Sequence, residues 1–202
     1  MSEKKYSVTS IAPRIDGFLK PLLRQGGFAV DYVIADGESV NPDFENPEVV
    51  VKFSGADVDL LLANKAELLL ALEYIAMEAL HMPSEDHSRL SFDAQDYRAL
   101  RIEELRLSAA TAAEKVKRTG SPFRFNPMNS RERRVIHLAL RNETEVRSES
   151  SGHGGFRQVI IYPAGMASLP EAPPPPPSYQ RAGRSPMRGD RGRPRAQGRG
   201  RS

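Results

Sequence analysis

Residues 126–137 read Asn-Pro-Met-Asn-Ser-Arg-Glu-Arg-Arg-Val-Ile-His, and they indicate the start of an amphipathic helix. We expect Ser130 to cap this helix, which should continue to about Leu140. In a helical projection, the apolar side chains from Val135 to Leu140 cover one broad side. The polar side carries Ser130, Arg133, Arg134, His137 and Arg141. Because Arg133, His137 and Arg141 are spaced four residues apart, the pattern predicts one continuous ridge.

This ridge of side chains has the chemistry that phosphate groups require. A guanidinium offers forked donors that match phosphate oxygens, and an imidazole adds a donor that strengthens on protonation. A charged outer helix face is also common without any partner. The spacing alone therefore leaves a solvated basic face open as the alternative.

The segments on both sides of this helix predict an α+β fold. On the C-terminal side, strands are expected over residues 144–148 and 156–162, joined by a glycine-rich turn at 151–155. On the N-terminal side, a long charged helix over 96–118 precedes a short strand at 123–125. The first part of the chain predicts helices over 11–23, 57–62 and 67–80 and strands over 28–34, 49–53 and 89–93. That part has the element order α-β-β-α-α-β.

The segment around residues 126–137 resembles the nucleic-acid-binding domain family named for its Arg-x-x-x-His signature, in the version found in bacterial Jag-type proteins. The resemblance extends to the helix end at 113–120, to Glu149, Ser150 and Gly152 in the turn, and to the final strand at 157–161. It implies a small α/β module that binds single-stranded nucleic acid. It also implies that Arg133 and His137 are the signature pair and that Arg157 joins them from the sheet.

Residues 11–95 resemble the KH domain that precedes the signature domain in Jag-type proteins. The similarity covers residues 60–74, around the Gly-x-x-Gly loop of that fold, and residues 93–98 after it. Here Ala63 and Ala66 replace the two glycines, and Asn64 and Lys65 lie between them. Glycine lets the backbone approach phosphates closely, so we expect this degenerate loop to have lost most of its grip on RNA. The KH-like half would then be a scaffold or a protein-docking surface, with weak binding through Asn64 and Lys65 as the alternative.

The net charge of +3 conceals a strong asymmetry along the chain. Residues 11–90 contain 6 basic and 14 acidic residues, a balance of −8, whereas residues 91–163 contain 13 basic and 9 acidic residues, a balance of +4. Residues 164–202 carry eight arginines against two acidic residues, a balance of +6. We therefore expect a polyanion to meet the C-terminal half.

These shifts in composition divide the chain into four parts. We expect a flexible N-terminus at 1–10, the KH-like domain at 11–95, the long helix with the signature domain at 96–163, and a disordered tail at 164–202. The tail contains five consecutive prolines at 173–177, which favour polyproline II. Its arginines, expected to add backbone contacts and stacking on unpaired bases, are Arg181, Arg184, Arg188, Arg191, Arg193, Arg195, Arg199 and Arg201.

Several classes of protein are excluded or disfavoured by the composition. The chain has no cysteine, which excludes disulfides and thiolate zinc sites, and its four scattered histidines lack ligand spacing, so we expect no metal and no cofactor. No apolar leader or bilayer-length segment is present, so a cytoplasmic protein without membrane association is expected. An enzyme would need His137 as a base with Glu132 or Glu149, but nothing supplies an oriented nucleophile.

The sequence thus predicts a non-catalytic protein that binds single-stranded RNA or DNA through the Arg133 helix face and the basic tail. The resemblance implies a role in post-transcriptional regulation and a second KH-domain protein as a partner. The alternative is a protein-interaction adaptor that uses the acidic KH-like half and the proline-rich tail and has little affinity for nucleic acid.

Overall fold

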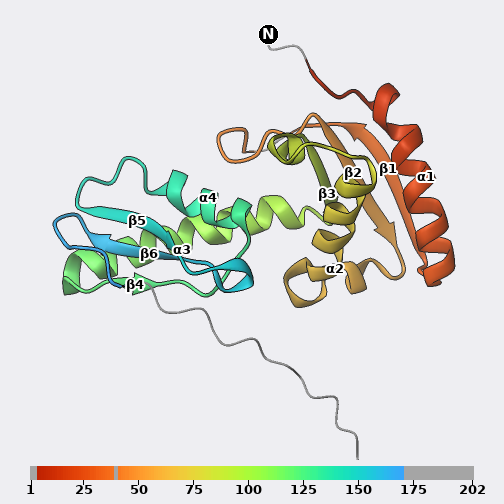
Figure 1. Cartoon of the computed structure of the whole chain (residues 1–202). Coiled ribbons are helices and arrows are strands. Elements are labelled where there is room, and N and C mark those ends of the chain that lie inside the picture. The colour runs from red at the N-terminus through yellow and green to blue at the C-terminus, as the bar shows by residue number, and fades with distance from the viewer. Residues whose placement is uncertain (1–3, 39–40, 171–202) are drawn as a thin grey trace, which may run out of the picture. The chain divides into compact units, whose positions relative to one another are not determined.

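The computed structural model describes residues 4–38 and 41–170 (Figure 1). Its first helix, α1 (Val8–Gly26), buries Ile11, Ile15, Leu19 and Leu23, one residue per turn. The side chain of Ser7 accepts a hydrogen bond from the Ser10 N–H and caps this helix. Residues 8–10 therefore belong to α1 rather than to the flexible N-terminus expected from the sequence.

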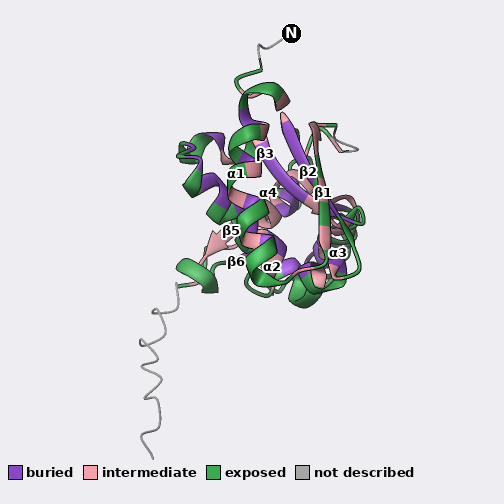
Figure 2. Ribbon diagram, turned by 90° about the vertical axis from the view of Figure 1, so that its right-hand side faces the viewer, coloured by how far each residue is buried: buried purple, intermediate pink, exposed green. Residues whose placement is uncertain are grey.

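The KH-like half contains a three-stranded sheet with the order β1-β2-β3. Its strands are β1 (Val30–Asp36), β2 (Val49–Gly55) and β3 (Leu90–Ala94). β1 pairs antiparallel with β2, and β2 pairs parallel with β3. A parallel pair needs a long crossover, which α2 (Val58–Ala79) and the short helix η1 (Ser84–Arg89) supply. β2 and β3 are the most deeply buried strands of this sheet (Figure 2).

The backbone leaves helical geometry within α2, at the break expected over residues 63–66. Ala63 is extended (φ −56°, ψ 151°), and Asn64, Lys65 and Ala66 follow in the left-handed conformation with φ of 52°, 62° and 58°. The Tyr97 hydroxyl donates a hydrogen bond of 2.8 Å to the Lys65 carbonyl and holds the loop from outside. Left-handed backbone is disfavoured for any residue with a Cβ. The loop thus follows a path suited to glycine, although it contains none.

The second half of the described chain builds a separate sheet with the order β4-β6-β5, antiparallel throughout. Its elements are α3 (Tyr97–Thr119), β4 (Phe123–Arg124), α4 (Ser130–Ala139), β5 (Val146–Ser151), the short helix η2 (Gly154–Phe156) and β6 (Gln158–Pro163). α3 contacts β3 of the first sheet and β4, β5 and β6 of the second (Figure 1). Phe44, from the segment between β1 and β2, packs against the core formed by α3, α4, β5 and β6. Two small sheets with helices confirm the predicted α+β class.

Two predictions about α4 were wrong at its ends. Asn129, not Ser130, caps the helix, since its side chain accepts a 2.9 Å hydrogen bond from the Glu132 N–H and the Glu132 carboxylate accepts one from the Asn129 N–H. The helix ends at Ala139, and the Arg141 N–H turns back to the Leu138 carbonyl at 3.3 Å. Arg141 therefore lies beyond the helix and does not continue the ridge of Arg133 and His137.

Some expectations fall outside the described residues or concern absences. The prolines at 173–177 and the tail arginines from Arg181 to Arg201 lie outside them. None of the described helices combines the length and apolar character that a membrane span needs. Within residues 4–38 and 41–170, His, Asp and Glu side chains form no group of three suited to a metal ion.

Candidate nucleic-acid interface

Arg133 and His137 lie one turn apart on α4 and both contact β5. Arg133 Nη1 donates to Ser150 Oγ at 3.1 Å. His137 Nε2 lies 3.0 Å from the same oxygen, and His137 Nδ1 lies 2.7 Å from Ser148 Oγ. Ser148 and Ser150 are two residues apart on a strand and so share a face. We call these four residues the signature cluster.

The imidazole of His137 is held in place by this cluster. It is half-buried, and burial, followed by the charge of Arg133, lowers the pKa of His137. A neutral imidazole has one donor and one acceptor nitrogen, and a serine hydroxyl can serve either, so Ser148 and Ser150 satisfy both nitrogens. In the free protein His137 therefore orients Ser150, and through it Arg133, rather than offering an N–H outward.

Arg133 and Arg157 bring two positive charges together without a counter-charge among the described residues. Burial, and then the charge of Arg157, lowers the pKa of Arg133. Arg133 Nε is buried and has no hydrogen-bond partner within the described chain. Arg157 is exposed and follows η2 directly. Two guanidiniums without a carboxylate form an unfavourable arrangement that an anion would relieve.

The turn between β5 and β6 sets the position of Arg157. The strands pair from Val146 with Pro163 to Ser151 with Gln158, so the turn spans residues 152–157. Gly152 has φ +96°, and a Cβ on it would lie 2.7 Å from the Phe156 carbonyl oxygen, so no larger residue fits there. The Arg157 carbonyl accepts a 3.1 Å hydrogen bond from the Met128 N–H. This bond joins the turn to the segment that leads into α4.

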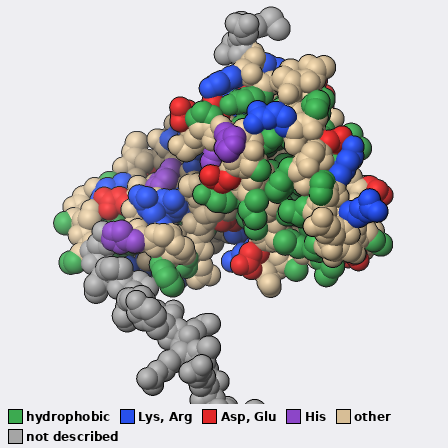
Figure 3. All heavy atoms as spheres, turned by 45° about the vertical axis from the view of Figure 1, so that its right-hand side comes forward, with side chains coloured by type: hydrophobic (Ala, Val, Ile, Leu, Met, Phe, Trp, Pro, Cys, Tyr) green, Lys and Arg blue, Asp and Glu red, His purple; other side chains and the backbone are tan. Residues whose placement is uncertain are grey.

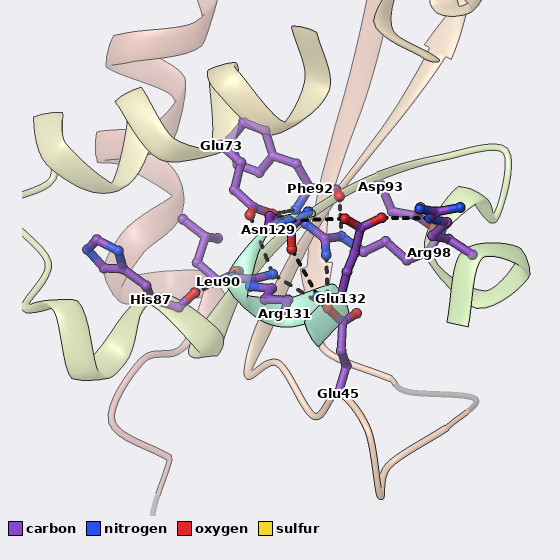
Figure 4. Close-up of polar contacts among 11 residues, drawn as sticks. Glu45, Glu73, His87, Leu90, Phe92, Asp93, Arg98, Asn129, Arg131 and Glu132 are labelled. Atoms are coloured by element: carbon purple, nitrogen blue, oxygen red, sulfur yellow. Dashed lines mark hydrogen bonds and ion pairs between the residues drawn. The ribbon is translucent and has the colours of Figure 1, made fainter. Parts of the chain in front are cut away.

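The opposite side of α4 attaches to the KH-like half (Figure 4). Arg131 donates to the carbonyls of His87 and Leu90, the second at 3.0 Å. Its Nη1 also lies 3.4 Å from a carboxylate oxygen of Glu73 and 3.8 Å from one of Glu45. The first turn of α4 is therefore fixed to η1 and β3, while Arg133 faces β5.

Glu73 is the most buried member of this connection, with 6% of its surface exposed. It accepts a 2.7 Å hydrogen bond from the Phe92 N–H and an ion pair from Arg98, which also pairs with Glu45 at 2.9 Å. Glu45, Glu73, Arg98 and Arg131 together form what we call the buried ion network. Each of its carboxylates faces both arginines, which offsets the cost of burial.

Sequence reasoning missed the buried ion network and the two serines of the signature cluster. Arg131 reads as one more cation in a basic run, and only its angular position, about half a turn from Arg133, separates the two roles. Glu73 was detectable, because it falls between the buried positions Leu69, Leu72 and Ala76 of an apolar helix. The alternation of Ser148 and Ser150 on a strand facing a helix was a weaker signal.

The remaining predicted residues are dispersed. Ser130, Arg134 and Arg141 are exposed. The carboxylates considered as partners of a catalytic His137 are engaged elsewhere: Glu132 accepts from Arg101 Nε at 2.6 Å, and Glu149 pairs with Arg147. On the face drawn in Figure 3, acidic and basic side chains are interspersed rather than gathered into one basic patch. The uncompensated pair Arg133 and Arg157 therefore distinguishes this site.

Comparison with known proteins places the signature cluster within a family. The model of the Arg-x-x-x-His signature domain matches residues 103–163. The chain is 34% identical over 144 residues to the RNA-binding protein KhpB of Clostridium symbiosum, an alignment that covers 71% of this chain and 62% of the relative. It is 27% identical over 160 residues to the RNA-binding protein KhpB of Bacillus subtilis, covering 78% and 76% of the two chains.

A third relative, the RNA-binding protein KhpB of Lactiplantibacillus plantarum, is 29% identical over 119 residues, or 59% of this chain and 37% of the relative. The chain thus spans less than two thirds of the length of the Clostridium and Lactiplantibacillus relatives. The matched segment contains all four residues of the signature cluster and Arg157. Residues 103–163 are therefore an Arg-x-x-x-His signature domain, and the chain belongs to the Jag-type proteins represented by these KhpB relatives.

Proposed function

We propose that this chain binds single-stranded nucleic acid, RNA foremost, through the signature cluster and Arg157, and that it catalyses no reaction. The observation that carries the proposal is the pair Arg133 and Arg157, which lacks a carboxylate among the described residues. A phosphate oxygen supplies the missing negative charge and accepts the unused Arg133 donors. The printed names of the relatives, RNA-binding proteins, agree with this proposal.

Each group of the site has a separate task in this proposal. His137 and Ser150 orient the Arg133 guanidinium, so that little side-chain freedom is lost when a phosphate binds. Arg157 offers the second guanidinium from the sheet, and the exposed Arg134 and Arg141 attract the strand at longer range. Phosphate contacts position a strand without reading its sequence.

The test is titration of a labelled single-stranded RNA against the full chain at several salt concentrations. Arg133→Ala is expected to weaken binding about tenfold, since charged hydrogen bonds contribute about 1.5–3 kcal/mol, and to reduce the salt slope by about one. Arg24→Ala is the matched control, because Arg24 is an exposed arginine at the end of α1. If the two variants bind with equal affinity and slope, the site has been assigned to the wrong helix.

We further propose that the tail adds electrostatic contacts. A chain that ends after Pro170 keeps the hydrogen bond from the Leu169 N–H to the Tyr162 hydroxyl (3.2 Å) and the one from Arg147 to the Met166 carbonyl. It lacks all eight tail arginines. We expect it to bind every RNA sequence more weakly by the same factor. A loss confined to some sequences would contradict a purely electrostatic tail.

For the KH-like half we propose a supporting role, in a cytoplasmic protein whose domains divide as the sequence predicts. Its balance of −8 over residues 11–90 repels a polyanion, and the buried ion network fastens it to α4. A protein adaptor that uses this acidic half, with a second KH-domain protein as one partner, is the second candidate. Crosslinking of RNA to the protein in cells separates the two roles, since crosslinks concentrated around Lys65 would show that the loop binds RNA itself.

A further inference from the structure

Phe156 is an exposed aromatic ring at the end of the β5–β6 hairpin, with 62% of its surface accessible. It is the last residue of η2 and directly precedes Arg157. We infer that Phe156 is a stacking platform for an unpaired base whose phosphate lies at Arg133 and Arg157. The inference rests on the proposed function and adds to it a residue that selects single strands.

The turn holds the Phe156 ring outward by its own hydrogen bonds. The Phe156 N–H donates to the His153 carbonyl at 3.0 Å, and the Arg157 N–H donates to the Gly154 carbonyl at 3.3 Å. Gly152, in a conformation that L residues rarely adopt, brings its backbone against the Phe156 carbonyl. The ring therefore occupies a defined position and is not at the end of a loose loop.

There is room beside this ring for a ligand. A Cβ added to Gly154 or Gly155 would meet no atom within 4 Å. An exposed phenyl ring next to open backbone presents one face to solvent, and every base has a flat face that can cover it. Such stacking requires that the base be unpaired, and it tolerates any sequence.

The position of Phe156 relative to the cations distinguishes it from an ordinary exposed apolar residue, which is common on protein surfaces. The next residue, Arg157, is close enough to Arg133 to lower the pKa of that guanidinium. Ser150, bonded to Arg133 and His137, lies at the opposite end of the same turn. Leu107 of α3 is also 62% exposed, but its neighbour Arg106 is paired with Glu103 at 2.7 Å. Leu107 is therefore the matched control.

The first experiment is anisotropy titration of the full chain with labelled oligouridine and oligoadenosine, each alone and as their duplex. Phe156→Ala is expected to weaken both single strands by about fivefold to 100-fold, to leave duplex affinity unchanged and to keep the salt slope, because no charge is removed. Phe156→Trp restores the affinity, and Leu107→Ala binds as the wild type does. The inference is overturned if Phe156→Ala binds single strands normally, or loses duplex affinity equally, or if Phe156→Trp fails to restore binding.

The second experiment reports on the contact directly. The chain has no tryptophan, so Phe156→Trp introduces a single indole fluorophore. Stacking of a base is expected to quench its emission at saturating single-stranded RNA, whereas Leu107→Trp stays unquenched. Equal emission changes in the two variants would overturn the inference.

Arg133→Ala separates this inference from the proposed function. If Arg133→Ala weakens binding and Phe156→Ala does not, the cation site stands and the stacking platform is rejected. If neither substitution weakens binding, the proposed interface itself is rejected. Unfolding midpoints of the variants equal to that of the wild type establish that any loss reflects the contact and not the fold.

Discussion

Lys65 is the middle residue of three consecutive left-handed positions, with φ of 62°, and its side chain is exposed. The left-handed conformation costs a residue with a Cβ about 1–2 kcal/mol, which glycine does not incur. Glycine loses about 0.4–1 kcal/mol more backbone entropy on folding. The difference predicts that Lys65→Gly raises the free energy of unfolding by about 0.5–1 kcal/mol.

The two neighbours of Lys65 set the scale for this prediction. Asn64 has φ of 52°, but asparagine tolerates this region well, so Asn64→Gly should gain only a few tenths of a kcal/mol. Ala66 has φ of 58° and is fully buried, and removing its methyl group loses about 0.8 kcal/mol of burial. Ala66→Gly should therefore be close to neutral. The expected order of gain is Lys65, then Asn64, then Ala66.

The assay is thermal and urea denaturation of the wild type and these three variants, with Lys65→Ala as the control that removes the charge but keeps the Cβ. For a chain of this length, the gain at Lys65 corresponds to a rise in Tm of about 1–4 °C. Lys65→Ala should not raise it. If Lys65→Gly destabilises the protein, or if Lys65→Ala stabilises it equally, then left-handed strain at this loop is not the cause.

Three further substitutions test the cap, the buried ion network and the protonation of the signature cluster. Asn129→Ala should lower the free energy of unfolding by about 1 kcal/mol and Ser130→Ala by less than half of that, measured by urea denaturation, because only Asn129 caps α4. Glu73→Ala should lower it by about 3–5 kcal/mol, since Arg98 would remain buried without its nearest carboxylate; a loss below about 1 kcal/mol would contradict this. Because the pKa of His137 is lowered in the folded chain, the unfolded chain protonates first, so stability should fall as pH drops below about 6.5. A bound phosphate would favour the protonated imidazole, so RNA affinity should rise over the same pH range, and a pH-independent affinity, equal to that of His137→Gln, would refute this.

Most of the fold could be predicted because its elements carry strong local signals. Helix and strand periodicity placed every described helix of eight residues or more and all six described strands, with boundaries that moved by a few residues. The break within α2 was predicted from the resemblance, but its left-handed backbone was not, because Ala63 and Ala66 gave no local reason to expect it. Local sequence describes preference, and here the surrounding structure overrides it.

The site was less predictable than the fold because its geometry depends on contacts distant in sequence. The pair Arg133 and His137 was found from its spacing, yet the partners that hold it, Ser148 and Ser150, come from another element. The end of α4 before Arg141 could not be read from a sequence that remains helical in composition. Arg131 shows the same limit, since its acceptors, the carbonyls of residues 87 and 90, are backbone atoms that no sequence pattern displays.

Phe44 has a consequence for how such a chain can evolve by exchange of parts. The family match begins at residue 103, but Phe44 packs against the core of that segment from more than fifty positions upstream. A gene fusion that moved residues 103–163 alone would uncover the apolar surface under Phe44 and leave Arg131 without its two carbonyl acceptors. The recipient chain would have to provide an aromatic side chain and two free carbonyls at matching places. In this lineage the inheritable unit is therefore longer than the segment that the signature defines.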